Sequence, residues 1–388
     1  MRILHTSDWH LGRTLHGVPL IDAQRDFLRW LAQLVGDRRV DVVVVAGDVY
    51  DRALPGLDAV RVLEQGLDEL SARAPVVLIP GNHDSGPRLG FGARWFTDRI
   101  HIQADVAAAA TPIQAGGALI YAIPYLDPDL ARPGVADLCG EPADGIARSH
   151  EAVLGRVLAL ARADLEHRRA TGPRLPAVVM AHAFVTGAKP SESERDIRVG
   201  GVDAVPAQAF EGFDYAALGH LHGPQRVGGG DAMRYAGSPL AFSFSEADHH
   251  KSVALVDFDA DGRLGGVELV PTPVPRHLSD VSGTLDEVLS PRFAAQRDDW
   301  VRITVRGDVR PEGLLATLRR TFPHVLEHHF APLQTAIQPR SGVGRGAVDP
   351  LEVTATFVRQ ATGADPTAPE RDVLRRAYEA ARREEGSR

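Results

Sequence analysis

The chain has 388 residues, 44% hydrophobic and 24% charged, which is ordinary for a globular protein of roughly two or three domains. Its formal net charge of −8 excludes an overall basic field for nucleic acid, although bound metal ions would supply positive charge locally. The single cysteine, Cys139, excludes an internal disulfide, and no apolar run has the length of a signal peptide or membrane span, so we expect a cytoplasmic protein with no membrane contact.

Five short apolar runs predict buried β-strands. In chain order they are Arg2–Thr6, Val40–Ala46, Pro75–Pro80, Ala177–Ala181 and Tyr215–Leu218. Apolar residues at spacings of three and four predict helices between some of these strands, as from Leu57 to Leu70 and from Val153 to Leu165. Strands that alternate with helices predict a layered α/β domain.

Beyond Gly219 the pattern changes to hairpins. One is predicted over residues 226–236 and another over residues 251–270, each around a glycine-containing turn. The proline-rich stretch Pro271–Pro275 cannot continue a hydrogen-bonded ladder. We therefore expect one large domain over residues 1–270 and a new domain from residue 271.

The C-terminal part divides again. Residues 271–340 contain one clear alternating strand, Trp300–Arg306, followed by a helix from Pro311 to Thr321. Ser341–Gly346 has the composition of a flexible linker, so residues 341–388 are predicted to be a separate tail. Two helices are expected in that tail, because Asp349-Pro350 and Thr367-Ala368-Pro369 are helix-start signals, each followed by an apolar stripe.

Each of the five predicted strands ends at residues that can bind a metal ion. These are Asp8 and His10, then Asp48 and Asp51, then Asn82, His83 and Asp84, then His182, and finally His220 and His222. The carboxyl ends of strands in a layered α/β domain share one edge, so these side chains are expected to converge. Oxygen and imidazole ligands without thiolate favour Mn, Fe or Zn, with Mg also open.

Each element alone has an ordinary structural explanation. Asp8 and His10 would more often belong to a turn, and an isolated His182 would more often be a hydrogen-bonded core residue. Five such elements in order, each after an apolar run, outweigh those explanations. Such a ligand set would suit phosphoester hydrolysis, because two divalent ions roughly 3.5–4 Å apart activate water and hold phosphate oxygens.

The ordered motifs DxH, GDxxD, GNHD, a single His and GHxH resemble those of the calcineurin-like metallophosphoesterases. The resemblance implies an α/β fold, a four-layer sandwich of two β-sheets flanked by helices. Similarity to the layout of a nuclease subfamily, given below, adds a small α+β capping domain over residues 271–340 that would contact DNA, and a helical C-terminal tail. The family resemblance also implies that Asp48 bridges two ions. The remaining ligands would be Asp8, His10 and His222 for one ion and Asn82, His182 and His220 for the other.

The same resemblance assigns catalytic roles. His83 would not bind metal, and would protonate the leaving oxygen or steady transition-state charge. The Asp51 carboxylate would orient that ring, although related nucleases carry a histidine at this position. Arg52 would contact the substrate phosphate, with a surface arginine as an equal alternative.

Two longer segments are similar to the SbcD subfamily of bacterial DNA-break nucleases, namely His5–Gly12 and Tyr235–Glu246. This implies a Mn-dependent DNA exonuclease and endonuclease that cleaves DNA ends and hairpins and associates with the nucleoid. It also implies that residues 349–388 bind an SbcC-like ATPase and that the chain forms a homodimer. The stripe from Leu57 to Leu70 would supply the dimer interface, or more simply pack into the core.

Two other functions remain open at this stage. The first is a stand-alone metallophosphatase or cyclic-nucleotide phosphodiesterase, which would need neither the capping domain nor the tail. The second is a DNA-end tether whose catalysis is incidental, which the complete ligand set argues against.

Overall fold

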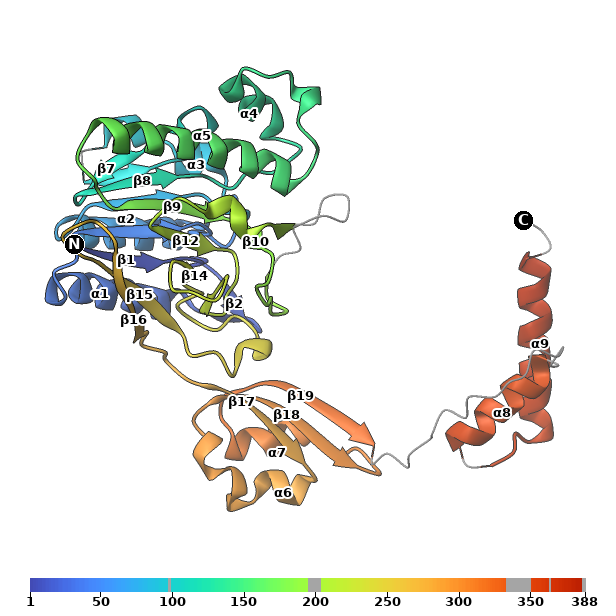
Figure 1. Ribbon diagram of the computed structural model, residues 1–388. Coiled ribbons are helices and arrows are strands. Elements are labelled where there is room, and N and C mark those ends of the chain that lie inside the picture. The colour runs from blue at the N-terminus through green and yellow to red at the C-terminus, as the bar shows by residue number, and fades with distance from the viewer. Residues whose placement is uncertain (97–98, 195–203, 333–349, 363, 386–388) are drawn as a thin grey trace. The chain divides into compact units, whose positions relative to one another are not determined.

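The computed structural model describes residues 1–96, 99–194, 204–332, 350–362 and 364–385 (Figure 1). By its internal contacts the chain forms two compact units. The first unit comprises Met1–Val305 and Glu312–His329, and the second comprises Arg306–Pro311 and Phe330–Arg388. The first unit contains all the candidate ligands.

Two six-stranded sheets form the centre of the first unit. The first sheet, in spatial order, consists of β16 (Leu264–Pro271), β15 (Ser252–Phe258), β1 (Arg2–Thr6), β4 (Val42–Ala46), β5 (Val76–Ile79) and β6 (Ile100–Ile102). The second consists of β13 (Gln225–Arg226), β14 (Met233–Tyr235), β12 (Tyr215–Gly219), β9 (Ala177–His182), β8 (Ala118–Ala122) and β7 (Ile113–Ala115). All five predicted strands are present, and both predicted hairpins pair antiparallel.

The sheets face each other across an apolar core, because neighbouring residues of a strand point to opposite faces. In β4, Val42 and Val44 pack between the sheets, whereas Val43 and Val45 pack under the helices of the first sheet. Because both faces of the strand are covered, the sequence there is continuously apolar rather than alternating.

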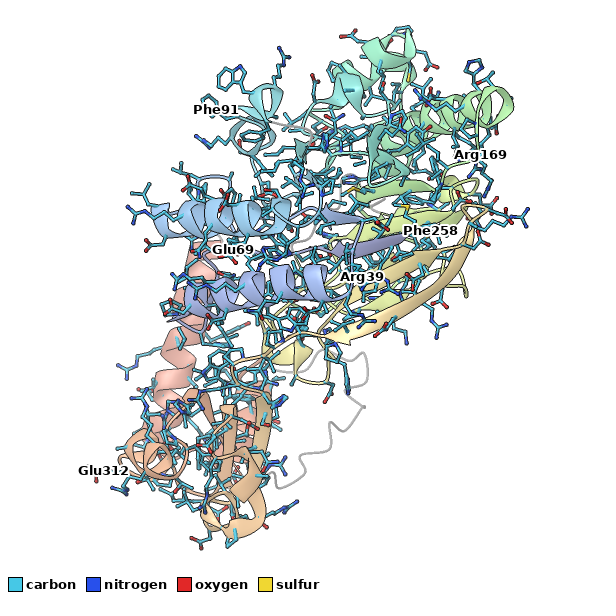
Figure 2. The ribbon with its side chains drawn as sticks, turned by 90° about the vertical axis from the view of Figure 1, so that its left-hand side faces the viewer. Arg39, Glu69, Phe91, Arg169, Phe258 and Glu312 are labelled. Atoms are coloured by element: carbon cyan, nitrogen blue, oxygen red, sulfur yellow. The ribbon has the colours of Figure 1, made fainter. Side chains whose placement is uncertain are left out.

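Helices cover the outer face of each sheet (Figure 1). On the first sheet lie α1 (Ile21–Asp37) and α2 (Leu57–Ser71), which contact each other side by side (Figure 2). On the second lie α4 (Arg132–Cys139) and α5 (His150–Thr171). The order helix, sheet, sheet, helix confirms the predicted four-layer α/β sandwich. In α2 the stripe from Leu57 to Leu70 is buried at Leu63, Leu67 and Leu70, whereas Leu57 and Val60 are exposed.

A three-stranded sheet follows the sandwich along the chain. It is formed by β17 (Leu278–Gly283), β18 (Trp300–Gly307) and β19 (Val325–Pro332), with α6 (Leu285–Leu289) and α7 (Leu314–Thr321). The sequence predicts only β18 and α7 of these elements. The domain bounds at 270 and 340 stay predictions. Smaller elements of the first unit are β2 (Thr14–Leu15), β3 (Val18–Pro19), α3 (Gly86–Leu89), β10 (Phe184–Val185) and β11 (Ala204–Val205).

The second unit ends in two helices, α8 (Pro350–Thr362) and α9 (Ala368–Glu385). Both begin where the helix-start signals predict, and the predicted linker Ser341–Gly346 lies outside the described residues. Leu351 and Ala355 of α8 and Leu374 of α9 line one hollow, so the two helices lie against each other. Among the described residues, no helix has both the length and the apolar character to cross a bilayer.

Candidate metal centre

The loops that follow β1, β4, β5, β9 and β12 meet at one edge of the two sheets. Main-chain hydrogen bonds join the first two loops, from Asp8 N–H to Gly47 O at 3.0 Å and from His10 N–H to Asp48 O at 2.9 Å. The Asp48 carboxylate in turn accepts from the His83 main-chain N–H at 2.8 Å. The strand ends therefore deliver their polar side chains to one place, as the sequence predicts.

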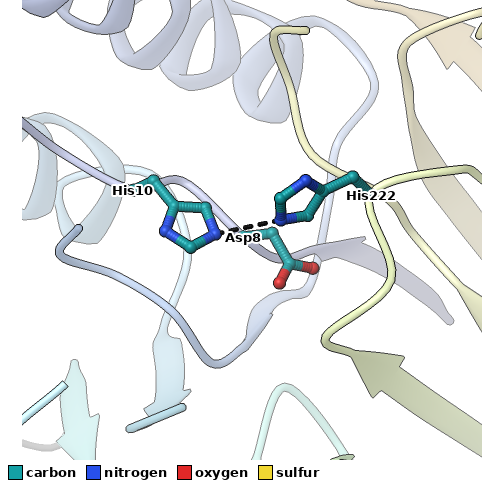
Figure 3. A group of neighbouring side chains, drawn as sticks. All are labelled: Asp8, His10 and His222. Carbon is teal, nitrogen blue, oxygen red and sulfur yellow. Dashed lines mark hydrogen bonds between the residues drawn. The ribbon is translucent and has the colours of Figure 1, made fainter. Parts of the chain in front are cut away.

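Three of these side chains form a first cluster, namely Asp8, His10 and His222 (Figure 3). One ligand atom from each lies within 4.8 Å of the others, and all three residues are buried. The Nε2 atoms of His10 and His222 are 3.1 Å apart. Two imidazole nitrogens and a carboxylate that face each other in a buried space form a set that a cation would satisfy.

A second cluster consists of Asn82, His182 and His220. The Asn82 side-chain oxygen lies 2.9 Å from His182 Nε2 and 3.2 Å from His220 Nδ1. Asp48 lies between the two clusters, because its Oδ2 is 3.5 Å from His10 Nε2 and 3.4 Å from His182 Nε2. All seven residues expected as ligands are thus brought together.

The backbone at this edge is strained in a way that only the surrounding fold can hold. Asp8, His10, Asp48 and His220 all have positive φ, at 53°, 45°, 50° and 107°. Non-glycine residues rarely adopt this region, and such strain concentrates at functional sites. A Cβ atom on Gly219 would collide with the Ala46 carbonyl, so glycine lets the two sheets approach closely at the centre.

The pKa shifts of the buried groups show where the centre stabilises positive charge. Although burial disfavours a charged ring, the Asp48 carboxylate raises the pKa of His182 to about 9. Burial lowers the pKa of His220 to about 3 and raises that of Asp8 to about 6. The Asp48 carboxylate therefore stabilises positive charge beside it, which a divalent cation would supply when bound.

The chemistry of the donor atoms also fits bound cations. The Asn82 side chain turns its oxygen towards His182 and His220, and His10 turns its Nε2 towards His222 and Asp48. The donor set is two carboxylates, one amide oxygen and four imidazoles, which suits two divalent ions with mixed nitrogen and oxygen ligands.

His83 lies beside the clusters, with its Nδ1 atom 2.8 Å from the main-chain oxygen of Asp51. The Asp51 carboxylate does not make that contact. It lies 3.4 Å from Arg13 and 3.5 Å from Arg52 instead. The ring is therefore oriented by the backbone of Asp51, whereas the sequence assigned that role to the side chain. Arg52 is 79% exposed.

An open cavity of about 540 Å³ adjoins the centre. It is lined by Arg13, Thr14, Asp51, Arg52, Ala53, Asn82 and His83. Arg13 is a site residue that sequence reasoning missed. Its guanidinium stacks 4.8 Å from the centre of the Phe242 ring, and its position three residues after His10 is the signal that could have found it. The cavity thus offers positive charge to an anionic substrate.

Two further carboxylates that the sequence did not assign support the loops. Asp84 accepts hydrogen bonds from the main-chain N–H groups of Val49, Tyr50 and Gly81, which ties the loop after β4 to the loop after β5. Glu246 lies against His222, with its Oε1 atom 3.2 Å from His222 Nδ1. Local sequence patterns could not reveal either contact, because both join segments far apart in the chain.

Among solved structures, the chain is similar to TT1561 of Thermus thermophilus at 12% identity and to a dimetal phosphatase from Danio rerio at 13%. Each match covers 70% of this chain and 98% of the other, with TM-scores of 0.37 and 0.39. GAP50, the anchor in the inner membrane complex of Plasmodium, matches at 12% identity over 70% of this chain and 89% of its own, with a TM-score of 0.37. These scores are too low to bear on function.

The sequence pattern of the calcineurin-like phosphoesterases matches residues 1–224. Every candidate ligand, from Asp8 to His222, falls within that match. Because it spans more than half of the 388 residues, the chain belongs to the calcineurin-like phosphoesterase family, whose members hydrolyse phosphoesters with divalent metal ions.

Proposed function

We propose that the chain is the Mn-dependent nuclease subunit of an SbcCD-like complex, acting as exonuclease and endonuclease on DNA ends and hairpins near the nucleoid. The strongest support for this proposal is the part of the chain that follows the family match. Residues 225–388 include a three-stranded sheet with two helices and a separate helical pair, which hydrolysis of a small phosphate ester does not require.

The site supports a phosphodiester as substrate. Two divalent ions, when bound, would supply an activated water and positive charge for the phosphate. Asp48 would be shared between the ions, with the first and second clusters completing one site each. Arg13 and Arg52 line an open cavity beside this centre, so a long anionic chain could pass without being enclosed.

His83 is proposed as the group that protonates the departing ribose oxygen. Its Nδ1–H can donate to the Asp51 carbonyl whether or not Nε2 carries a proton. The ring can therefore gain and lose a proton at Nε2 without rotating. This suits a general acid, and His83 lines the cavity where the leaving group would stand.

The helical pair α8 and α9 supports an SbcC-like ATPase as partner. Val353, Phe357 and Val373 remain 51%, 68% and 55% exposed, although the two helices lie against each other. Short helices gain most of their stability by burying an apolar face, and these retain one that is uncovered. Docking on a partner helix or coiled coil would bury it.

A second exposed apolar patch supports self-association. Leu54 and Leu57 are 71% and 74% exposed, and Phe91 and Trp95 are 75% and 78% exposed. A hydrogen bond of 3.1 Å from Arg88 to the Ala53 carbonyl joins the two segments that carry these side chains. Sedimentation should show a dimer for the full chain and a monomer for Leu57→Glu. A wild-type monomer would contradict the homodimer.

The test of the nuclease proposal compares substrates on one preparation. The full chain would be assayed on a hairpin oligonucleotide, linear duplex DNA and p-nitrophenyl phosphate, with Mn or Mg, and with or without an SbcC-like ATPase. We expect Mn-dependent cleavage of the hairpin and the duplex, with slow hydrolysis of the monoester. Faster turnover of the monoester would favour a phosphatase, and end-bridging without cleavage would favour a DNA tether.

A further inference from the structure

We propose that Glu246, held in place by Lys251, is a positioning residue that aims the His222 imidazole at the metal ion of the first cluster. The inference rests on the phosphoesterase metal centre and on none of the finer claims about DNA. It assigns a function to a buried ion pair that lies outside the ligand set.

Each polar group of His222 has a hydrogen-bond partner outside the ligand set, except the Nε2 nitrogen, which faces the first cluster. Its main-chain N–H donates to Glu194 at 2.8 Å, and its carbonyl accepts from Lys251 Nζ at 2.9 Å. Its Nδ1 atom lies 2.7 Å from Ser193 Oγ and 3.2 Å from Glu246 Oε1. Only Nε2 is left to point towards His10 and Asp8.

The partners of Nδ1 decide which nitrogen carries the proton. An ionised carboxylate only accepts hydrogen bonds, so Glu246 favours a proton on Nδ1. Ser193 also donates to Glu246, which leaves its own oxygen lone pairs to accept from the ring. The neutral ring then presents the Nε2 lone pair to the first cluster, which is the state that binds a metal ion.

Lys251 fixes the Glu246 carboxylate in place. Its ammonium contacts Glu246 Oε2 and donates to Ser238 Oγ at 2.8 Å as well as to the His222 carbonyl. The side chains of Glu246 and Lys251 are 0% and 3% exposed. The lysine therefore binds both the carboxylate and the backbone of the histidine that the carboxylate orients.

The fold alone gives little reason for this pair. Taking a lysine and a glutamate out of water is costly, and apolar residues of similar size often replace a buried pair with no loss of stability. Here the pair instead adjoins the strained edge where the ligands meet. A role in presenting His222 accounts for both its burial and its location.

Loss of the Glu246 carboxylate should change the affinity for only one of the two metal ions. Among the described side chains, the Glu246 carboxylate contacts His222 of the first cluster and makes no hydrogen bond or ion pair with Asn82, His182 or His220. Partners of this kind change metal affinity by about 10- to 100-fold. Loss of Glu246 should therefore weaken one of two metal equivalents and leave the other unchanged.

The experiment titrates the full chain with Mn²⁺ by calorimetry, with no DNA present, and follows the same samples by electron paramagnetic resonance. Glu246→Leu combined with Lys251→Met removes the acceptor without leaving a buried charge. Glu246→Gln keeps the shape and a neutral acceptor oxygen, so it should have a smaller effect in the same direction. Unfolding in chelator checks that each variant is folded.

Asp214→Asn is the matched control. Asp214 is a carboxylate with 10% exposure that binds Arg169 at 2.6 Å and the Ala177 N–H at 2.9 Å, at the end of β9 away from the ligands. This variant should lower the free energy of unfolding while leaving both Mn²⁺ equivalents unchanged. The control therefore distinguishes a general loss of protein stability from a loss of orientation of the His222 ring.

We expect wild type to bind two equivalents with an exchange-coupled resonance signal. The Leu/Met double variant should lose about 10- to 100-fold in affinity for one equivalent and give the six-line signal of isolated Mn²⁺ at limiting metal. Two unchanged equivalents, or two equally weakened, would overturn the proposal. If the double variant does not fold, Glu246→Gln decides by the same criteria. Because no nucleic acid is present, a different substrate would leave the result unchanged.

Discussion

Replacing His83 by glutamine tests whether this ring is an acid or a ligand. Both roles are geometrically open, since a His83 nitrogen and ligand atoms of His10 and Asp48 all lie within 4.8 Å of one another. The contact from Nδ1 to the Asp51 carbonyl leaves Nε2 open for either role. The acid is favoured because the seven expected ligands form both clusters without His83, and His83 lines the open cavity. We therefore expect His83→Gln to keep both Mn²⁺ equivalents.

The expected size of the effect follows from that role. General acid catalysis contributes about 10²- to 10⁴-fold, or about 2.7–5.4 kcal/mol in the barrier. The loss should depend on the leaving group. A ribose oxygen needs a proton to depart, so hairpin cleavage should fall by the full factor. p-Nitrophenolate departs unaided, so hydrolysis of bis(p-nitrophenyl) phosphate should fall much less.

The assay measures kcat on both substrates and metal content on one sample of each variant. His167→Gln, an exposed histidine on α5, serves as the control and should match wild type. Loss of one Mn²⁺ equivalent would show that His83 is a ligand. An equal loss of kcat on both substrates would refute proton donation, even with the metal retained.

Three further predictions concern other parts of the chain. Asp48→Ala should weaken both Mn²⁺ equivalents in a calorimetric titration and His10→Ala only one; equal losses in the two variants would rule out a shared Asp48. Deleting residues 349–388 should abolish co-purification of an SbcC-like ATPase while sparing Mn-dependent cleavage of short DNA, and undiminished co-purification would place the interface elsewhere. Burial lowers the pKa of His5 to about 3, whereas a histidine in the unfolded chain has a pKa of about 6.5. Between these pH values only the unfolded chain binds a proton at His5, so the free energy of unfolding falls as pH falls. In chelator, His5→Phe should flatten the slope of unfolding free energy between pH 6 and 4 by up to about 1.4 kcal/mol per pH unit, and an unchanged slope would contradict a neutral His5.

Local pattern predicted the layered α/β domain and its ligand edge, and the family resemblance supplied the four-layer sandwich. A strand covered on both faces must be continuously apolar, and β4 is. The positions after each strand end then identify the ligands. The small sheet after residue 271 carries no such signal. In β17 only Leu278, Val281 and Gly283 are buried, so neither an apolar run nor strict alternation marks the strand.

The contacts that support the centre could not be predicted for a different reason. Glu246 meets His222 across 24 residues, and Asp84 meets Val49 across 35. Arg13 approaches Asp51 across 38. Nothing in the local pattern around a carboxylate or an arginine says which distant loop it will meet. Tertiary structure alone supplies this information.

The pairing of β1 with β15 affects how the protein is made. Arg2 lies opposite Asp257, so β1 waits during synthesis for one of its two neighbours until some 250 residues later. At about 5–20 residues per second, that wait lasts on the order of 10–50 s, with one strand edge open to wrong partners. A chain shortened to the family match at residue 224 would keep every ligand and leave that edge open permanently. Such a fragment should aggregate, so the minimal stable phosphoesterase fragment must extend at least through β15 and β16.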